Sequence, residues 1–201
     1  PRTAPPDKPS PYRRMIRIFS VLAIANAIGL IASFAFGWVS KLTGARLDPE
    51  SNYYIIHFLC GLFTAVCTLL VHCLIFTYFL GTGRWVKEVT IAYDLPDEPL
   101  HKTTRELKRK TFPPALFAML FTIATSAAGA GVQLQDWTWH VHFGLAVLAI
   151  AVNFWAYAVE YRALRRNEEI LAAVYVEVDC VRAERGLPSN EEALRMQGTE
   201  R

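Results

Sequence analysis

The stretch that decides the fold is YIIHFLCGLFTAVCTLLVHCLIFTYFL, residues 54–80, in which no Asp, Glu, Lys or Arg occurs. At a rise of about 1.5 Å per residue, a helix of this length exceeds the roughly 30 Å hydrocarbon core of a bilayer. Three further runs are similarly apolar and lie at residues 15–38, 112–132 and 137–160. Their only charges are Arg17 and Glu160, each near one end of its run. The sequence therefore predicts four transmembrane helices.

The composition of the whole chain supports a membrane protein over a soluble one. Hydrophobic residues make up 53% of the 201 residues and charged residues only 19%, and the charges crowd into the two ends and residues 84–111. A soluble helix keeps one polar face, whereas these runs are apolar all round. We expect an all-α, polytopic membrane protein: a four-transmembrane-helix bundle with cytoplasmic helical extensions.

The remaining segments define the expected domain organisation. We predict a lead that is disordered or interfacial, a transmembrane domain, and a cytoplasmic helical extension with a polar tail, at residues 1–14, 15–165 and 166–201. Within the cytoplasmic loop expected over residues 84–111, the second helix should continue past Gly81 and Gly83 as a short amphipathic segment. The prolines of DLPDEPL should end it, and a basic helical turn should follow. Pro113 and Pro114 are expected to open the third helix, and the chain from Gly186 on should be a loose tail.

The helix after Glu160 carries an apolar seam with a repeat near 3.5 residues, interrupted by Asn167. The seam residues are Leu164, Leu171, Val174, Val178 and Val181. Such a seam must be buried against the middle loop, a second copy of the chain or another membrane subunit. A homo-oligomer or a membrane complex assembled through this helix is therefore one expectation.

The distribution of Lys and Arg predicts the orientation. These residues are concentrated before the first run, within residues 84–111 and directly after the fourth run, and they are sparse in the other two connections. Positive charge marks the cytoplasmic side, so both termini are expected in the cytoplasm of a bacterial-type inner membrane. The basic segments then face lipid headgroups, and no nucleic-acid partner is expected.

Small residues and cysteines of the helices are given structural interpretations. In TIATSAAGAG, residues 122–131, pairs such as Thr125 and Gly129 stand four positions apart, a spacing that allows close helix approach in lipid. The four cysteines show no zinc-type or dithiol spacing, and we expect no disulfide. P-loop, nucleophile-elbow and HExxH motifs do not occur in the sequence.

Histidines in the apolar runs are the candidates for chemistry, because ionisable groups are costly inside a bilayer. The stretch QDWTWHVHFG, residues 135–144, places His140 and His142 at the outer end of the fourth run, and His57 lies at the same depth in the second. His72 lies about 22 Å lower along its helix. At 100° per residue, His142 shares a stripe with Asn153, Tyr157 and Glu160, whereas His140 shares one with small residues.

These positions support a haem hypothesis. Imidazoles from two helices are suited to axial ligation inside a bundle, so His57 and His142 are predicted to bind one haem b, with His140 as substitute. Gly61 would leave room for the porphyrin. The outer-level Lys41 or Arg46 would meet its propionates. The protein would then be a small b-type cytochrome or the membrane subunit of an electron-transfer complex.

The pattern is similar to membrane b-type cytochromes only in outline. Cytochromes with two haems usually carry two suitably spaced histidines on each ligating helix. Here His72 lies 15 residues after His57, and the fourth run has no lower histidine. A second haem is therefore not expected. Instead, His72, Asn153 and Tyr157 are candidates for a proton or quinone path.

Two alternatives remain open. His57, His140 and His142 could form a copper, zinc or iron site, completed by Asp136, Asp48 or Glu50, and such a site could serve an enzyme. On a regular helix the two histidines of His-x-His point about 200° apart, so this site requires an extended or frayed helix start. The other alternative is a structural or assembly subunit without a cofactor, held to its partners by small-residue faces and the seam.

Overall fold

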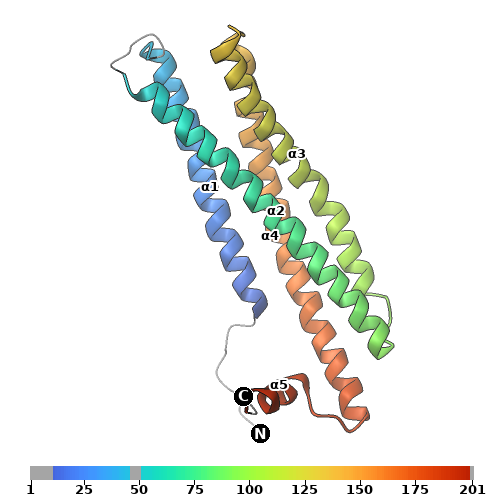
Figure 1. Ribbon diagram of the computed structural model, residues 1–201. Helices are drawn as coiled ribbons and strands as arrows, with labels where there is room; N and C mark the ends of the chain where they lie inside the picture. The colour runs from blue at the N-terminus through green and yellow to red at the C-terminus, as the bar shows by residue number, and fades with distance from the viewer. Residues whose placement is uncertain (1–10, 46–50, 200–201) are drawn as a thin grey trace.

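The fold of the protein is known from a computed structural model, which describes residues 11–45 and 51–199. Five helices follow one another along the chain, and these residues contain no strand (Figure 1). The helices are α1 (Pro11–Leu42), α2 (Tyr53–Tyr93), α3 (Leu100–Leu134), α4 (Trp139–Glu184) and α5 (Asn190–Thr199). The predicted all-α four-helix bundle is confirmed.

The four long helices are each long and apolar enough to cross a membrane. Large apolar side chains cover the outside of the bundle: Ile24 is 62% exposed, Phe63 72% and Leu70 63%. A soluble protein rarely exposes a continuous apolar surface of this kind. Lipid contact explains why these faces are apolar although they are not packed against protein.

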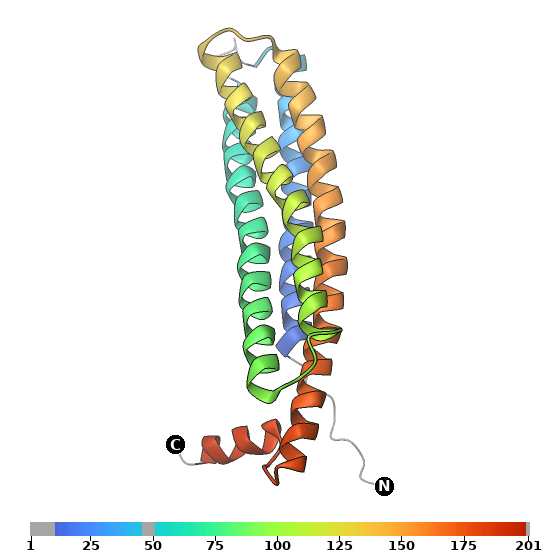
Figure 2. The same ribbon diagram turned by 90° about the vertical axis from the view of Figure 1, so that its right-hand side faces the viewer.

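The helices form two antiparallel hairpins, α1 with α2 and α3 with α4, which lie side by side (Figures 1 and 2). The end of α1, the start of α2 and the connection between α3 and α4, residues 135–138, lie at one end of the bundle, called here the histidine end. Residues 94–99 join the hairpins at the opposite end. The two hairpins diverge toward the histidine end in Figure 1, while α4 extends past its neighbours at the opposite end.

The second helix continues past Gly81 and Gly83 as predicted, and the helical parts of residues 84–111 are longer than the short pieces expected there. α2 continues to Tyr93, α3 begins at Leu100, and only residues 94–99 connect them. Asp94 ends α2 with a left-handed φ of 56°, and its backbone N–H donates to the carbonyls of Thr90 and Ile91. Gly81 and Gly83 lower helix propensity by only about 1 kcal/mol each, which tertiary packing of the extended helices overcomes.

The proline pair was also misplaced by the sequence analysis. Pro113 and Pro114 lie inside α3, which begins thirteen residues before Pro113, rather than in its first turn. Each proline removes one backbone hydrogen bond from the helix. Burial offsets part of this cost, because Pro114 and its neighbour Ala115 are buried in the bundle.

The seam on α4 is buried within the chain itself. Four of its five apolar members, together with Asn167, are almost completely inaccessible, and they pack in one core with residues from the extended ends of α2 and α3. Val86 is 0% exposed and Leu107 9% exposed in this core. Of the three coverings that the sequence left open, the middle segment of the same chain is the one observed.

The two ends of the chain also differ from expectation. Residues 11–14 belong to α1, while residues 1–10 of the predicted lead lie outside the described residues. The predicted loose tail contains α5, which follows a turn at Gly186. Asp179 holds the start of this helix, because its Oδ1 accepts hydrogen bonds from the backbone N–H and the side-chain amide of Asn190 at 2.8 and 2.9 Å.

Candidate functional site

Two histidines face each other between the hairpins at the histidine end. His57 lies in the second turn of α2 and His142 in the first turn of α4, and their ring centres are 6.1 Å apart with an interplanar angle of 71°. Both side chains are half-buried. The structure thus places the two predicted haem ligands together, one from each hairpin.

Each of the two rings is fixed by a backbone carbonyl of the other helix in its own hairpin. Nδ1 of His57 is 2.9 Å from the carbonyl oxygen of Ser33 in α1, and Nδ1 of His142 is 2.9 Å from that of Thr125 in α3. A carbonyl oxygen only accepts, so each Nδ1 carries the proton and donates it. In the neutral rings Nε2 then keeps its lone pair, the arrangement typical of histidines that bind metals.

A glycine one turn after each of these carbonyls makes room for the ring. A Cβ on Gly37 would lie 2.7 Å from Cε1 of His57, and a Cβ on Gly129 would lie 3.0 Å from Cε1 of His142. The two seats therefore have the same construction, Ser33 with Gly37 and Thr125 with Gly129. Gly37 was not predicted as part of the site, and Gly129 was predicted only as a helix contact. Both could have been found from the sequence, because each glycine lies level with a histidine on the paired helix.

Gly61 does not border an open space in the way the sequence suggested. A Cβ there would lie 3.1 Å from Oγ of Ser33, so Gly61 is a point of close approach between α1 and α2. Because Gly61 has no side chain, Ser33, whose carbonyl accepts from His57, can lie against α2. Gly61 therefore helps to position the residues that hold His57.

His140 does not join the pair. Its ring is exposed and lies 4.1 Å, centre to centre, from that of Trp139. Helix α4 is regular from Trp139 onward, so His140 and His142 point to different sides, as helical geometry requires. The predicted three-imidazole set is therefore not assembled, and no group of three or more metal-ligating side chains occurs within the described ranges 11–45 and 51–199.

The acidic and basic residues expected to complete a metal or haem site lie in different places. Asp48, Glu50 and Arg46 lie outside the described residues. Asp136 is exposed in the connection between α3 and α4. The ammonium of Lys41 lies 5.0 Å from the centre of the Trp139 ring, which places this cation at the histidine end, where a propionate partner was expected.

Aromatic side chains pack on the α1–α4 side of the histidine level. The ring of Phe143 lies 5.6 Å from each of Phe34 and Trp38, and 5.7 Å from Trp139, centre to centre. These rings form an aromatic cluster between α1 and α4 at the histidine end.

The distance between the two ring centres can be compared with the distances expected for two imidazoles that share one metal. A metal–imidazole bond of about 2 Å, plus roughly 1 Å from nitrogen to ring centre, puts two imidazoles on opposite sides of one metal about 6 Å apart. At a tetrahedral angle the same bonds would bring the ring centres to about 5 Å. The observed separation of 6.1 Å is closer to the first of these two values.

A second polar cluster lies deeper in the bundle, around His72. Nδ1 of His72 is 2.7 Å from Oε1 of Glu160, Nε2 is 3.1 Å from Oδ1 of Asn153, and the ring of Tyr157 stacks on the imidazole at 5.2 Å. The His72, Glu160 and Asn153 side chains are completely buried. Tyr157 is linked onward, because the amide nitrogen of Asn26 donates to its hydroxyl at 2.7 Å.

The cluster brings together the three residues predicted for a proton or quinone path and adds Glu160. Glu160 was expected on the same helix stripe as Asn153 and Tyr157, but only as the end of the fourth run. The shared stripe could have predicted that Glu160 is buried, because all three side chains lie in the bundle interior.

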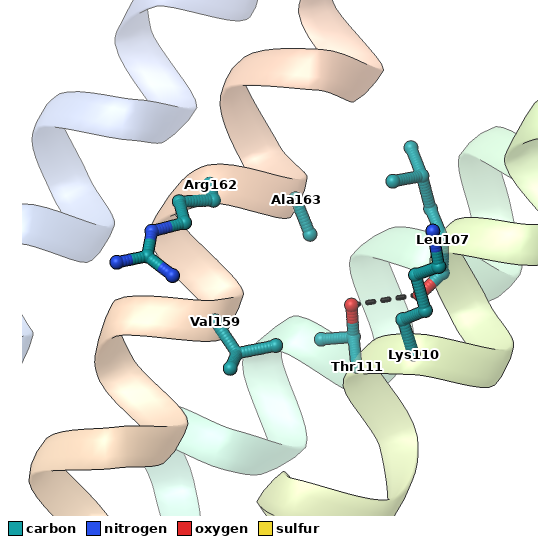
Figure 3. A pocket seen from close by; sticks show the side chains of 6 residues that line it. All are labelled: Leu107, Lys110, Thr111, Val159, Arg162 and Ala163. Carbon is teal, nitrogen blue, oxygen red and sulfur yellow. Dashed lines mark hydrogen bonds between the residues drawn. The ribbon is translucent and has the colours of Figure 1, made fainter.

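A shallow groove of about 210 Å³ lies between α3 and α4 (Figure 3). Leu107, Lys110, Thr111, Val159, Arg162 and Ala163 line it. The Thr111 hydroxyl is turned back to its own helix, donating to the carbonyl of Leu107 at 2.8 Å. The groove has apolar walls and two basic side chains at its rim, and it contains none of the predicted site residues.

Comparison with protein-family models, curated proteins and solved structures gave no match for this chain.

Proposed function

We propose that the protein is a small integral-membrane b-type cytochrome, or the membrane subunit of an electron-transfer complex, and that His57 and His142 bind one haem between the hairpins. One observation carries this proposal: the centres of the two rings are 6.1 Å apart, in an edge-to-face arrangement, while each Nδ1 donates to a backbone carbonyl. Both Nε2 atoms are then available as ligands without a change of tautomer.

A haem would supply one-electron transfer, and the protein residues account for its binding and surroundings. Ser33 and Thr125 orient the two imidazoles through their carbonyls, and hydrogen bonding at Nδ1 makes each ring a better donor. Phe143 and its aromatic neighbours pack between α1 and α4 at the same end of the bundle. Lys41 provides a cation for a propionate at the membrane surface, where it stays hydrated.

The proposal includes a location. The excess of Lys and Arg at the 94–99 end and near both termini favours the bacterial inner membrane with the termini in the cytoplasm. The histidine pair would then lie near the outer face, where it could exchange electrons with a partner outside the membrane or with another membrane subunit.

The alternatives have less support from the geometry. A tetrahedral metal ion needs a closer pair and further ligands than the described residues supply. A scaffold that recruits partners through the α4 seam would have to expose it, whereas the seam is buried against α2 and α3.

The test is the absorption spectrum of the full-length protein purified in mild detergent from cells supplied with a haem precursor. We expect one haem b per chain with a low-spin, bis-imidazole spectrum. His57→Ala and His142→Ala should each abolish that spectrum, and His140→Ala, the matched control, should leave it unchanged. Colourless protein, or colour that survives both ligand substitutions, would refute the proposal, and metal analysis of such protein would test the ion alternative.

A further inference from the structure

His72 and Glu160 form an acid–base pair enclosed by the membrane domain. They come from α2 and α4, their side chains are each 0% exposed, and their nearest atoms are 2.7 Å apart. Neither belongs to the proposed haem site, since His72 lies about 22 Å from His57 along the helix axis. Buried ionisable pairs in transmembrane helices commonly bind or transfer protons.

The proton on Nε2 of His72 is fixed by Asn153. The amide nitrogen of Asn153 lies 2.8 Å from the carbonyl oxygen of Ala149, which can only accept, so this atom is the donating NH₂ group. The other amide atom, Oδ1, therefore faces Nε2 at 3.1 Å. An amide oxygen carries no hydrogen and can only accept a hydrogen bond. The hydrogen between the two atoms therefore belongs to Nε2 of His72, which is protonated.

The hydrogen bond between Nδ1 of His72 and Oε1 of Glu160 contains one proton, which is bonded to one of these two atoms. Either a neutral Glu160 acid donates to Nδ1, or an imidazolium donates to a carboxylate. Within the described residues Oε2 of Glu160 has no hydrogen-bond partner, although it is buried. A carboxylate would leave that charged oxygen unsolvated, whereas the acid leaves only a neutral carbonyl. The neutral form is therefore favoured.

The surroundings of the pair also favour a neutral state. His72 is the ionisable side chain in contact with Glu160, and Tyr157, on the same helix as Glu160, is the other ionisable side chain close to both. From α1 the cluster receives the amide of Asn26, and from α3 the hydroxyl of Thr122, 3.2 Å from the amide nitrogen of Asn153. Neither group carries a charge that would stabilise a carboxylate.

We propose that His72 and Glu160 form a proton-binding site inside the membrane domain, which holds one exchangeable proton as the neutral acid of Glu160 donating to Nδ1. Loss of this proton breaks the O–H bond, transfers the proton to water and leaves one negative charge in the cluster. The site is separate from the haem site, so it should exist in protein without haem.

Infrared spectroscopy of the full chain in lipid nanodiscs tests the proposal. At neutral pH the wild type should show the C=O band of a protonated carboxyl group, shifted in D₂O, and Glu160→Gln should remove this band. Glu169→Gln, an exposed carboxyl group on the same helix, is the matched control and should leave the band unchanged. His57→Ala should retain it, which separates this site from the haem proposal.

Two infrared results would overturn the proposal: no difference between wild type and Glu160→Gln, or a band that does not shift in D₂O. If Glu160→Gln does not fold, ¹⁵N NMR of histidine-labelled wild type gives the same decision. We expect His72 as a neutral ring with its proton on Nε2. An imidazolium signal at neutral pH would instead show a permanent ion pair.

Discussion

Gly37→Ala is the sharpest test of the way the chain seats His57. The added Cβ would lie 2.7 Å from Cε1 and 2.9 Å from Nδ1 of the imidazole, whereas carbon atoms in contact prefer about 3.5–4.0 Å. The ring must therefore retreat by about 0.8 Å or α1 must move away from α2. Either movement lengthens the 2.9 Å hydrogen bond to the Ser33 carbonyl.

The expected size of the effect follows from overpacking, which typically costs about 1–3 kcal/mol. If this cost falls on the ligating conformation of His57, haem affinity drops by about 5- to 150-fold. Gly129→Ala should have a smaller effect, because its Cβ would lie 3.0 Å from Cε1 of His142. Gly144→Ala is the control: it has the same gain in helix propensity, close to His142 on α4, with no atom within 4 Å of the new Cβ.

The assay is a haem titration of each detergent-solubilised variant, followed by absorption, together with thermal unfolding of the haem-free protein. We expect the order of haem affinity to be Gly144→Ala equal to wild type, then Gly129→Ala, then Gly37→Ala. If Gly37→Ala binds haem as tightly as Gly144→Ala with an unchanged low-spin spectrum, the seat does not position a ligand, and the axial role of His57 loses its main support.

Three further predictions concern stability and orientation. Glu160→Ala should lower the free energy of unfolding in detergent by about 2–4 kcal/mol, since it leaves His72 without a partner and opens a cavity; a loss below that of Glu160→Gln would contradict this. Val174→Ala, at a site 0% exposed, should cost about 2 kcal/mol, and Val176→Ala, 62% exposed, less than 0.5 kcal/mol; equal losses would mean that the α4 seam is not packed as described. Cys180, exposed on the α4 extension, should react with a membrane-impermeant maleimide in inverted vesicles but not in intact cells; the reverse pattern would invert the proposed orientation.

The fold could be predicted because bilayer thickness and the absence of charge act on whole segments. Residues 54–80 sufficed to show a spanning helix, whichever residues it packs against. The helix ends were less predictable, since they depend on tertiary contacts. Val86 and Leu107 lie in charged segments whose sequence predicts only short helical pieces, and both are buried in the core that includes the α4 seam.

The two histidines of the candidate site could be predicted from the sequence, but the backbone carbonyls that hold their rings could not. The depth and stripe of His57 and His142 could be read from helical periodicity. Their anchors are backbone carbonyls, which every residue possesses, so nothing in the side chains of Ser33 or Thr125 marks them. Glu160 was misjudged for a related reason: a charge at the edge of an apolar run indicates a membrane boundary unless its buried partner, His72, is known.

The matching construction of the two seats restricts what can lie between the rings. Each hairpin supplies a carbonyl, a glycine one turn later and an imidazole from the paired helix, and the two imidazoles approach from opposite sides of the bundle. A packing role for His57 and His142 would not require the same tautomer in both, or space cleared beside each ring. A ligand that is coordinated alike on two opposite faces does require both features. The shared construction is the structural support for the proposal that one planar cofactor is bound by both imidazoles.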